Sequence, residues 1–146
     1  MKHKLLSALI LIFMFNAAFT QSTVSVFING VKKAEYITKT DETTGSINLK
    51  KSDCKKTKQL TVQIKGEHIG STIYKRAFEV TDNADISFLK VNETAGVPGQ
   101  FILTGTKLKS MLTKGKSLKL YLLMDPADDR SMAPSKRIYM GTIAAK

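Results

Sequence analysis

The sequence is poor in the residues from which catalytic and metal sites are usually built. It contains one cysteine, no tryptophan and two histidines. A zinc site needs three or four ligands, usually histidine and cysteine, and Cys54 with His68 falls short of that number. The chain also has no Gly-x-Ser-x-Gly elbow, no phosphate-binding loop of the P-loop type and no dinucleotide fingerprint. These absences favour a protein that works without a cofactor, a metal or catalysis.

Two enzymatic alternatives survive these absences. A Cys54–His68 thiolate pair would need a general-base geometry that no surrounding motif supports. Hydrolysis by two carboxylates requires no local motif, because such pairs come from distant segments, but a chain this short seldom forms the cleft. A small secreted hydrolase is therefore the most distant interpretation.

The single cysteine excludes an internal disulfide, so the fold must be held by packing alone. Lysines flank Cys54 in sequence and would lower the pKa of the thiol if they crowded around it at the surface. A disulfide-linked dimer through Cys54 is thus an alternative to a thiol without a role.

The N-terminus has the pattern of a secretory signal peptide. Two lysines in the first four residues precede an apolar run over Leu5–Phe15, and small residues follow it. A transmembrane anchor needs about 20 apolar residues, which is more than this run supplies. We predict cleavage after Thr20, with Ala18 as the second choice. The signal peptide is then 1–20, and the mature protein is exported to the periplasm or the extracellular space and does not span a membrane.

The remaining segment, 21–146, is long enough for one domain with its own core. Loss of Lys2 and Lys4 from the 23 basic residues leaves 21 against 12 acidic ones, a formal charge of +9. Such an excess favours contact with anionic surfaces, although lysine-rich solvated faces are also common in exported proteins.

The densest apolar stretch, Ser117–Met124, alternates with the two-residue period of a strand and predicts the central strand of the fold. Lys136–Ile143 has the pattern of its hairpin partner. Further strands are predicted where apolar residues alternate between turn signals. They cover Thr23–Ile28, Val31–Ile37, Ile47–Leu49, Gln59–Lys65, Ile73–Val80 with Arg76 at an edge or along the surface, Ile86–Val91 and Gln100–Thr104.

Three connections carry specific signals. Asn29-Gly30 predicts a two-residue hairpin turn, and Val97-Pro98-Gly99 predicts a type II turn. Thr106–Lys114 spaces Leu108, Met111 and Leu112 as on one face of a short helix. The basic segment Lys50–Lys58 reads as a connection without helix. About eight short strands and one helical crossover predict an all-β sandwich.

The last third of the chain, roughly residues 99–144, resembles the end of an immunoglobulin-like domain. It combines a short strand, a helical crossover, a strong central strand, a long loop and a final strand. The tryptophan and the cysteine pair of antibody-type domains are missing. The resemblance implies an immunoglobulin-like antiparallel sandwich and nothing about activity. The leader and the lysine-rich mature chain also resemble those of small proteins exported by Gram-negative bacteria.

The loop Asp125–Ser135 is the first place to expect function, because long loops on rigid strands are where binding concentrates. We predict that it binds a protein or glycan of the cell envelope. The residues proposed for this contact are Asp125, Asp128, Asp129, Arg130 and Met132. Alternatives are a stiff exposed turn without a role and, with less support, a calcium site, since the aspartates lack the spacing of an EF-hand.

Two lysine-rich runs support a second hypothesis, an electrostatic binder of lipid phosphate or acidic polysaccharide. The candidate anion-binding residues are Lys50, Lys51, Lys55, Lys56, Lys58, Lys107, Lys109 and Lys114. Neither run contains arginine or the interleaved aromatics typical of nucleic-acid binders, so specific nucleic-acid binding is not expected.

Overall fold

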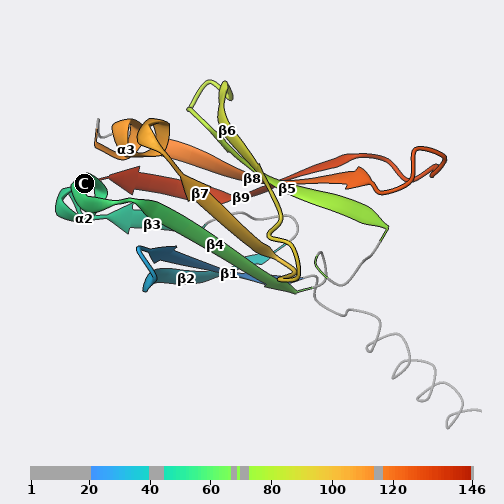
Figure 1. Cartoon of the computed structure of the whole chain (residues 1–146), viewed down its shortest axis with the longest axis horizontal. Coiled ribbons are helices and arrows are strands. Elements are labelled where there is room, and N and C mark those ends of the chain that lie inside the picture. The colour runs from blue at the N-terminus through green and yellow to red at the C-terminus, as the bar shows by residue number, and fades with distance from the viewer. Residues whose placement is uncertain (1–20, 40–44, 67–68, 70–72, 114–116, 146) are drawn as a thin grey trace, which may run out of the picture.

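The computed structural model describes residues 21–39, 45–66, 69, 73–113 and 117–145. Within this part of the chain, nine strands form two facing sheets, and two short helices lie together at one end of them (Figure 1). The strands are β1 (Gln21–Ile28), β2 (Val31–Lys39), β3 (Ser46–Leu49), β4 (Gln59–Gly66), β5 (Tyr74–Thr81), β6 (Ser87–Asn92), β7 (Gln100–Thr104), β8 (Ser117–Pro126) and β9 (Lys136–Ala145); the helices are α2 (Lys51–Lys56) and α3 (Thr106–Thr113). The predicted signal peptide, residues 1–20, lies outside the described residues.

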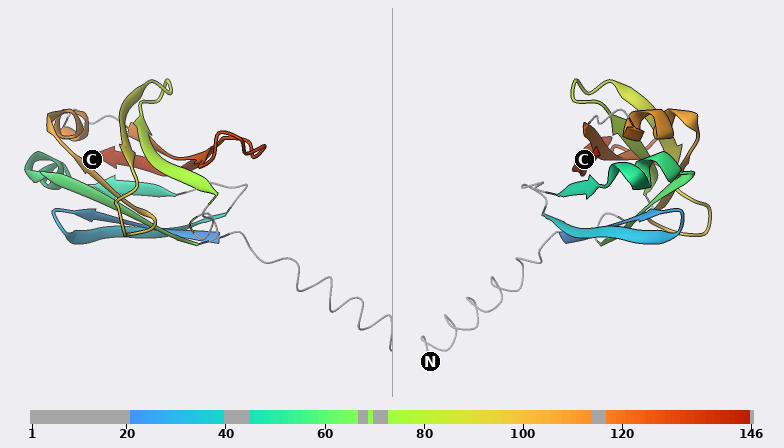
Figure 2. Two further views of the ribbon diagram at one scale, coloured as in Figure 1. Left: turned by 45° about the vertical axis from the view of Figure 1, so that its right-hand side comes forward. Right: turned by 90° about the vertical axis from the view of Figure 1, so that its left-hand side faces the viewer.

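The four-stranded sheet A has the order β2-β1-β4-β7, and the five-stranded sheet B has the order β3-β9-β8-β5-β6. The all-β sandwich predicted from the sequence is thus confirmed as a two-layered β fold (Figure 2). The expectation of purely antiparallel sheets is wrong at one pair, because β3 runs parallel to β9. The chain passes from β2 in sheet A to β3 in sheet B. There β3 lies beside β9 and runs in the same direction.

Alternating apolar side chains from both sheets form the core, as the two-residue period requires. The stretch singled out in the sequence is the inner strand β8, between β9 and β5. Its Leu118, Leu120, Leu122 and Met124 are at most 2% exposed. Phe78 of β5 and Phe101 of β7 stack across the two sheets with ring centroids 5.3 Å apart.

Both predicted turns are confirmed. Asn29 and Gly30 have positive φ values of 49° and 82°, as a type I′ hairpin turn requires, and they join β1 to β2. The Gln100 N–H donates to the Val97 carbonyl at 3.1 Å, and Gly99 has φ 75°. A side chain at the third turn position would be strained there, which accounts for the glycine.

The helix predicted over Thr106–Lys114 is confirmed as α3, and its Leu112 is fully buried. The side chains of Leu108 and Met111 lie outside the described residues. The prediction that Lys50–Lys58 lacks helix was wrong, because Lys51–Lys56 forms α2. This helix places Cys54 in the core with no exposed surface, and the Thr57 hydroxyl donates to the Asp53 carbonyl at 2.8 Å at its C-terminal end. Among the described side chains of α2 only Cys54 is buried, so the sequence offered no apolar period from which to predict this helix.

Arg76 was expected at an edge or along the surface, and this was also wrong. It lies on β5, which has neighbours on both sides, and its side chain is only 9% exposed. Nε and Nη2 donate to the two carboxylate oxygens of Glu93 at 2.8 and 3.0 Å. The Gly99 N–H donates to the same carboxylate at 2.5 Å. The pair ties β5 to the loop between β6 and β7.

Tyr36 connects the two sheets on the opposite side. It extends from β2, and its hydroxyl donates to the Met140 carbonyl of β9. Burial raises the pKa of this phenol. Gly141 lies against it with φ 129°, and a Cβ there would come within 2.6 Å of the Tyr36 hydroxyl and of the Gly45 carbonyl oxygen. A glycine is therefore required for this contact between the sheets.

Candidate anion-binding site

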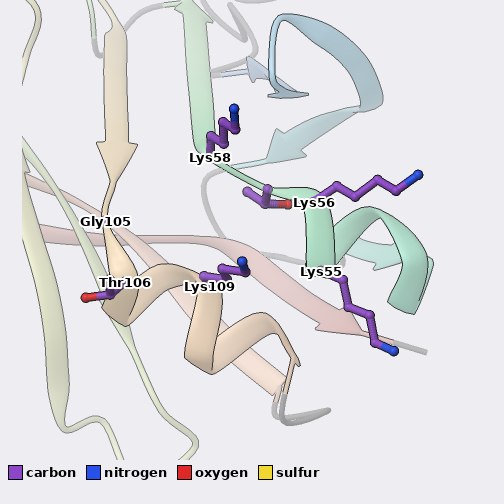
Figure 3. A pocket seen from close by; sticks show the side chains of 7 residues that line it. Lys55, Lys56, Lys58, Gly105, Thr106 and Lys109 are labelled. Carbon is purple, nitrogen blue, oxygen red and sulfur yellow. The ribbon is translucent and has the colours of Figure 1, made fainter.

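Helices α2 and α3 lie side by side, and their contact brings the two lysine-rich runs together. Lys55, Lys56, Lys58 and Lys109, all predicted from the sequence, line one depression of about 450 Å³ (Figure 3). Thr57, Gly105 and Thr106 complete its lining. The last three were not predicted, because nothing in the sequence around them indicates a site.

The turn between β1 and β2 fixes one side of this depression through Asn29. Its amide nitrogen donates to the Lys56 carbonyl at 2.9 Å, and its amide oxygen accepts from the N–H groups of Lys58 and Gln59 at 2.9 and 3.1 Å. The residue that makes the turn therefore also holds the end of α2 and the start of β4. The sequence indicated the turn but not this second role.

Lysine is the one charged residue type in the lining of this depression. Its lining includes no carboxylate, and the nearest acidic residue of α2, Asp53, is paired with Lys33 of β2 at 3.3 Å. Lys55 and Lys56 occupy the last turn of α2, where the helix dipole favours cations. The four ammonium groups point in different directions (Figure 3). This spacing suits several anionic groups on an extended ligand better than one small ion.

The other predicted lysines are not part of this arrangement. Lys50 lines a separate depression of about 440 Å³ together with Lys33, Asn48 and Asp53. The side chains of Lys51 and Lys107, and the whole of Lys114, lie outside the described residues.

The predicted binding loop forms the tip of the β8–β9 hairpin, at the end of the molecule away from α2 and α3 (Figure 1). Asp125 belongs to β8, and Asp128 is used to shape the turn, since its carboxylate accepts the Arg130 N–H at 2.9 Å. Met132 is fully exposed. Among the described residues, Asp125, Asp129 and Arg130 form no ion pair.

The described part of the chain contains no group of three or more histidine, cysteine, aspartate or glutamate side chains placed to hold a metal ion. The three aspartates of the loop therefore do not gather as a calcium site would require. Neither the lysine-lined depression nor the one beside Lys50 is lined by two carboxylates, so they offer no pair for hydrolysis. His68 lies outside the described residues.

Cys54 packs inside the core and directly precedes Lys55, which lines the depression. Burial raises the pKa of its thiol, and the neighbouring Asp53 raises it further. The flanking lysines therefore do not activate it. A disulfide-linked dimer through Cys54 remains a prediction, and it would require local opening of the helix.

A cluster that was not predicted covers the outer face of sheet B. The guanidinium of Arg137 lies 3.8 Å from the ring centroid of Tyr121, and the rings of Tyr121 and Tyr139 are 5.4 Å apart. The Tyr121 hydroxyl donates to Asp85 at 2.7 Å. Burial, followed by this hydrogen bond, raises the pKa of Tyr121 to about 12. The cluster braces neighbouring strands, as cross-strand aromatic pairs do.

A comparison with protein-family models finds no match to this chain. A search of curated proteins finds no significant similarity either. No helix among the described residues is long and apolar enough to cross a membrane.

Proposed function

We propose that this protein is an exported, non-catalytic binding module of the cell envelope, with an immunoglobulin-like β-sandwich that binds polyanions through the lysine-rich end formed by α2 and α3. The immunoglobulin-like assignment is supported by the order β7, α3, β8, long loop, β9, and by the position of β8 inside sheet B. Export is supported by the signal-peptide pattern of residues 1–20.

The observation that carries the proposal is the convergence of lysines from two distant segments on one depression without a carboxylate. Positive charges gathered around one depression raise the local concentration of anions there. A lysine near an anionic lipid surface contributes about 1 kcal/mol, so four of them give weak binding that salt weakens strongly. Phosphate of lipid headgroups and carboxylate of acidic polysaccharides share the chemistry that this site recognises.

The test compares two charge reversals of equal size. Lys55→Glu/Lys58→Glu changes the depression, and Lys75→Glu/Lys90→Glu changes exposed lysines on sheet B. Mature protein is sedimented with phosphatidylglycerol vesicles, with phosphatidylcholine vesicles, and with insoluble calcium pectate. We expect binding to an anionic partner that the first variant loses and the second largely retains. An equal loss of binding in both variants would mean that binding depends on net charge alone, which would contradict a site at the depression.

The β8–β9 loop is a second candidate for binding an envelope protein or glycan. It is favoured by its position at the tip of a long hairpin, with Asp129 and Arg130 unpaired among the described residues and Met132 fully exposed. Retention on envelope material that persists at about 0.5 M salt, where the screening length is about 4 Å, would favour this loop over the lysines. Asp129→Ala and Arg130→Ala should then weaken it.

A further inference from the structure

The outer face of sheet A differs in chemistry from the rest of this basic protein. The structure describes all of β1, β4 and β7. Along each of these strands, side chains point alternately into the core and outward. Most of the outward side chains are uncharged and carry a hydroxyl or amide group: Thr23, Ser25, Gln59, Thr61, Gln63, Gln100 and Thr104. Lys65 is the one charged side chain on the outward faces of these three strands.

The strand register arranges these side chains in two neighbouring rows. Phe27, Thr61 and Ile102 are cross-strand partners in the first row, and Ser25, Gln63 and Gln100 are partners in the second. An aromatic ring and an aliphatic side chain therefore lie directly beside a row of hydroxyl and amide groups. Partners within a row are about 5 Å apart, and the two rows are about 7 Å apart along the strands, so one sugar ring can contact both rows.

Four residues of these rows contribute to a depression of about 570 Å³, lined by Phe27, Gly30, Thr61, Gln63, Lys65, Val97 and Gln100. The Gln63 side-chain nitrogen donates to the Pro98 carbonyl at 3.1 Å, which fixes this amide and leaves its oxygen free to accept. The side-chain amide of Gln100 makes no hydrogen bond to any described residue. The Arg76–Glu93 pair and the Val97-Pro98-Gly99 turn hold the rim rigid.

These features define the chemistry of the ligand. Amides and hydroxyls donate and accept at once, as sugar hydroxyls do, and a half-buried ring offers an apolar face to the C–H groups of a pyranose. No carboxylate lines the depression, and Lys65 is the one charged residue of its lining. Other charges on this side of sheet A, Lys32 and Glu35, lie on the edge strand β2 and pair with each other. A mostly apolar hollow with a few fixed polar groups is the usual form of a small binding site.

We propose that the outer face of sheet A binds a segment of an uncharged polysaccharide, with Phe27 against one sugar ring and Gln63 and Gln100 hydrogen-bonded to its hydroxyls. This site is independent of the lysine-lined depression, because it recognises neutral rather than anionic groups. Its failure and the failure of the polyanion proposal would therefore appear in different assays.

The experiment is a depletion assay with insoluble cellulose, chitin, curdlan and xylan, in about 0.5 M NaCl to screen the lysines. Wild-type mature protein is expected to bind at least one of them. Phe27→Leu keeps apolar bulk but removes the ring face, and Gln100→Ala removes an amide without a structural partner. Each should weaken binding about tenfold, whereas Lys55→Glu/Lys58→Glu should bind as the wild type. Thermal unfolding of each variant shows that the fold is kept.

Three results would overturn the proposal. The first is that the wild type binds none of the four polysaccharides. The second is that Phe27→Leu and Gln100→Ala both bind as tightly as the wild type. The third result is a dimer in sedimentation equilibrium that Phe27→Leu dissociates, because the face would then be a contact between two copies of the chain.

Discussion

Replacing Glu93 by glutamine would remove the carboxylate charge that faces the nearly buried guanidinium of Arg76. The two side chains are 9% and 20% exposed, and both carboxylate oxygens accept from the guanidinium. Glutamine has nearly the same shape and can still accept one of these hydrogen bonds, so the change isolates the charge.

The expected magnitude follows from this burial. Breaking a fully buried pair costs about 3–5 kcal/mol, and an exposed pair is worth about 0.2–1 kcal/mol. The exposures of Arg76 and Glu93 place the pair nearer the buried limit, and we expect Glu93→Gln to lower the free energy of unfolding by about 2–3 kcal/mol. For a domain of this length, that lowers Tm by about 10 °C.

The loss should also depend on pH. Burial alone would raise the pKa of Glu93, but the Arg76 side chain and the Gly99 amide together lower it below its ordinary value of 4.5. A carboxyl whose pKa is lower in the folded than in the unfolded protein stabilises the fold above the unfolded value. The difference between wild type and Glu93→Gln should therefore be full above about pH 4.5 and shrink as the pH falls through the folded pKa of Glu93.

Urea unfolding of the mature protein at neutral pH and between about pH 3 and 5 measures both effects. Arg76→Met and the double variant complete a mutant cycle that isolates the coupling. Glu35→Gln, in the exposed pair with Lys32, is the matched control and should cost less than about 1 kcal/mol. A loss from Glu93→Gln as small as that of the control would refute the reasoning.

Three further predictions test the packing and the lysine-lined depression. Gly141→Ala should destabilise the protein by at least about 2 kcal/mol in urea unfolding, because its Cβ would clash with Tyr36 at a positive φ; no measurable change would contradict the close contact. Cys54 should react with Ellman's reagent only as fast as the protein opens, since the thiol is buried, and a fast native reaction would contradict this. Asn29→Ala should cost about 2 kcal/mol and weaken polyanion binding in the vesicle assay, because it removes the hydrogen bonds that hold Lys58. Asn29→Gly, which tolerates the positive φ, should recover part of the stability but not the binding.

The sequence predicted the strands and turns because their signals are local. The alternation of Leu118, Leu120 and Leu122 and the Asn29-Gly30 turn each depend on a few neighbouring residues. The parallel pairing of β3 with β9 depends on two segments far apart in the chain, and no residue in either encodes the partner. Arg76 was misplaced for the same reason, because the carboxylate that permits its burial comes from another segment.

The candidate sites show the same limit. The charge of Lys55, Lys58 and Lys109 was visible in the sequence, but their grouping depends on the contact between α2 and α3. That contact in turn depends on α2, which was not predicted, because Cys54 alone is buried among its described side chains and one residue gives no apolar period. The rows on the outer face of sheet A likewise require the strand register, which alternation alone does not supply.

The parallel pairing of β3 with β9 has a consequence for how the chain can be cut. β9 covers β3 on one side and β8 on the other, so its loss would uncover two rows of backbone donors and acceptors at once. Exposed strand edges of this kind recruit other chains. A protease that removes β9 would therefore leave β3 and β8 as open edges and make the remaining chain prone to aggregation.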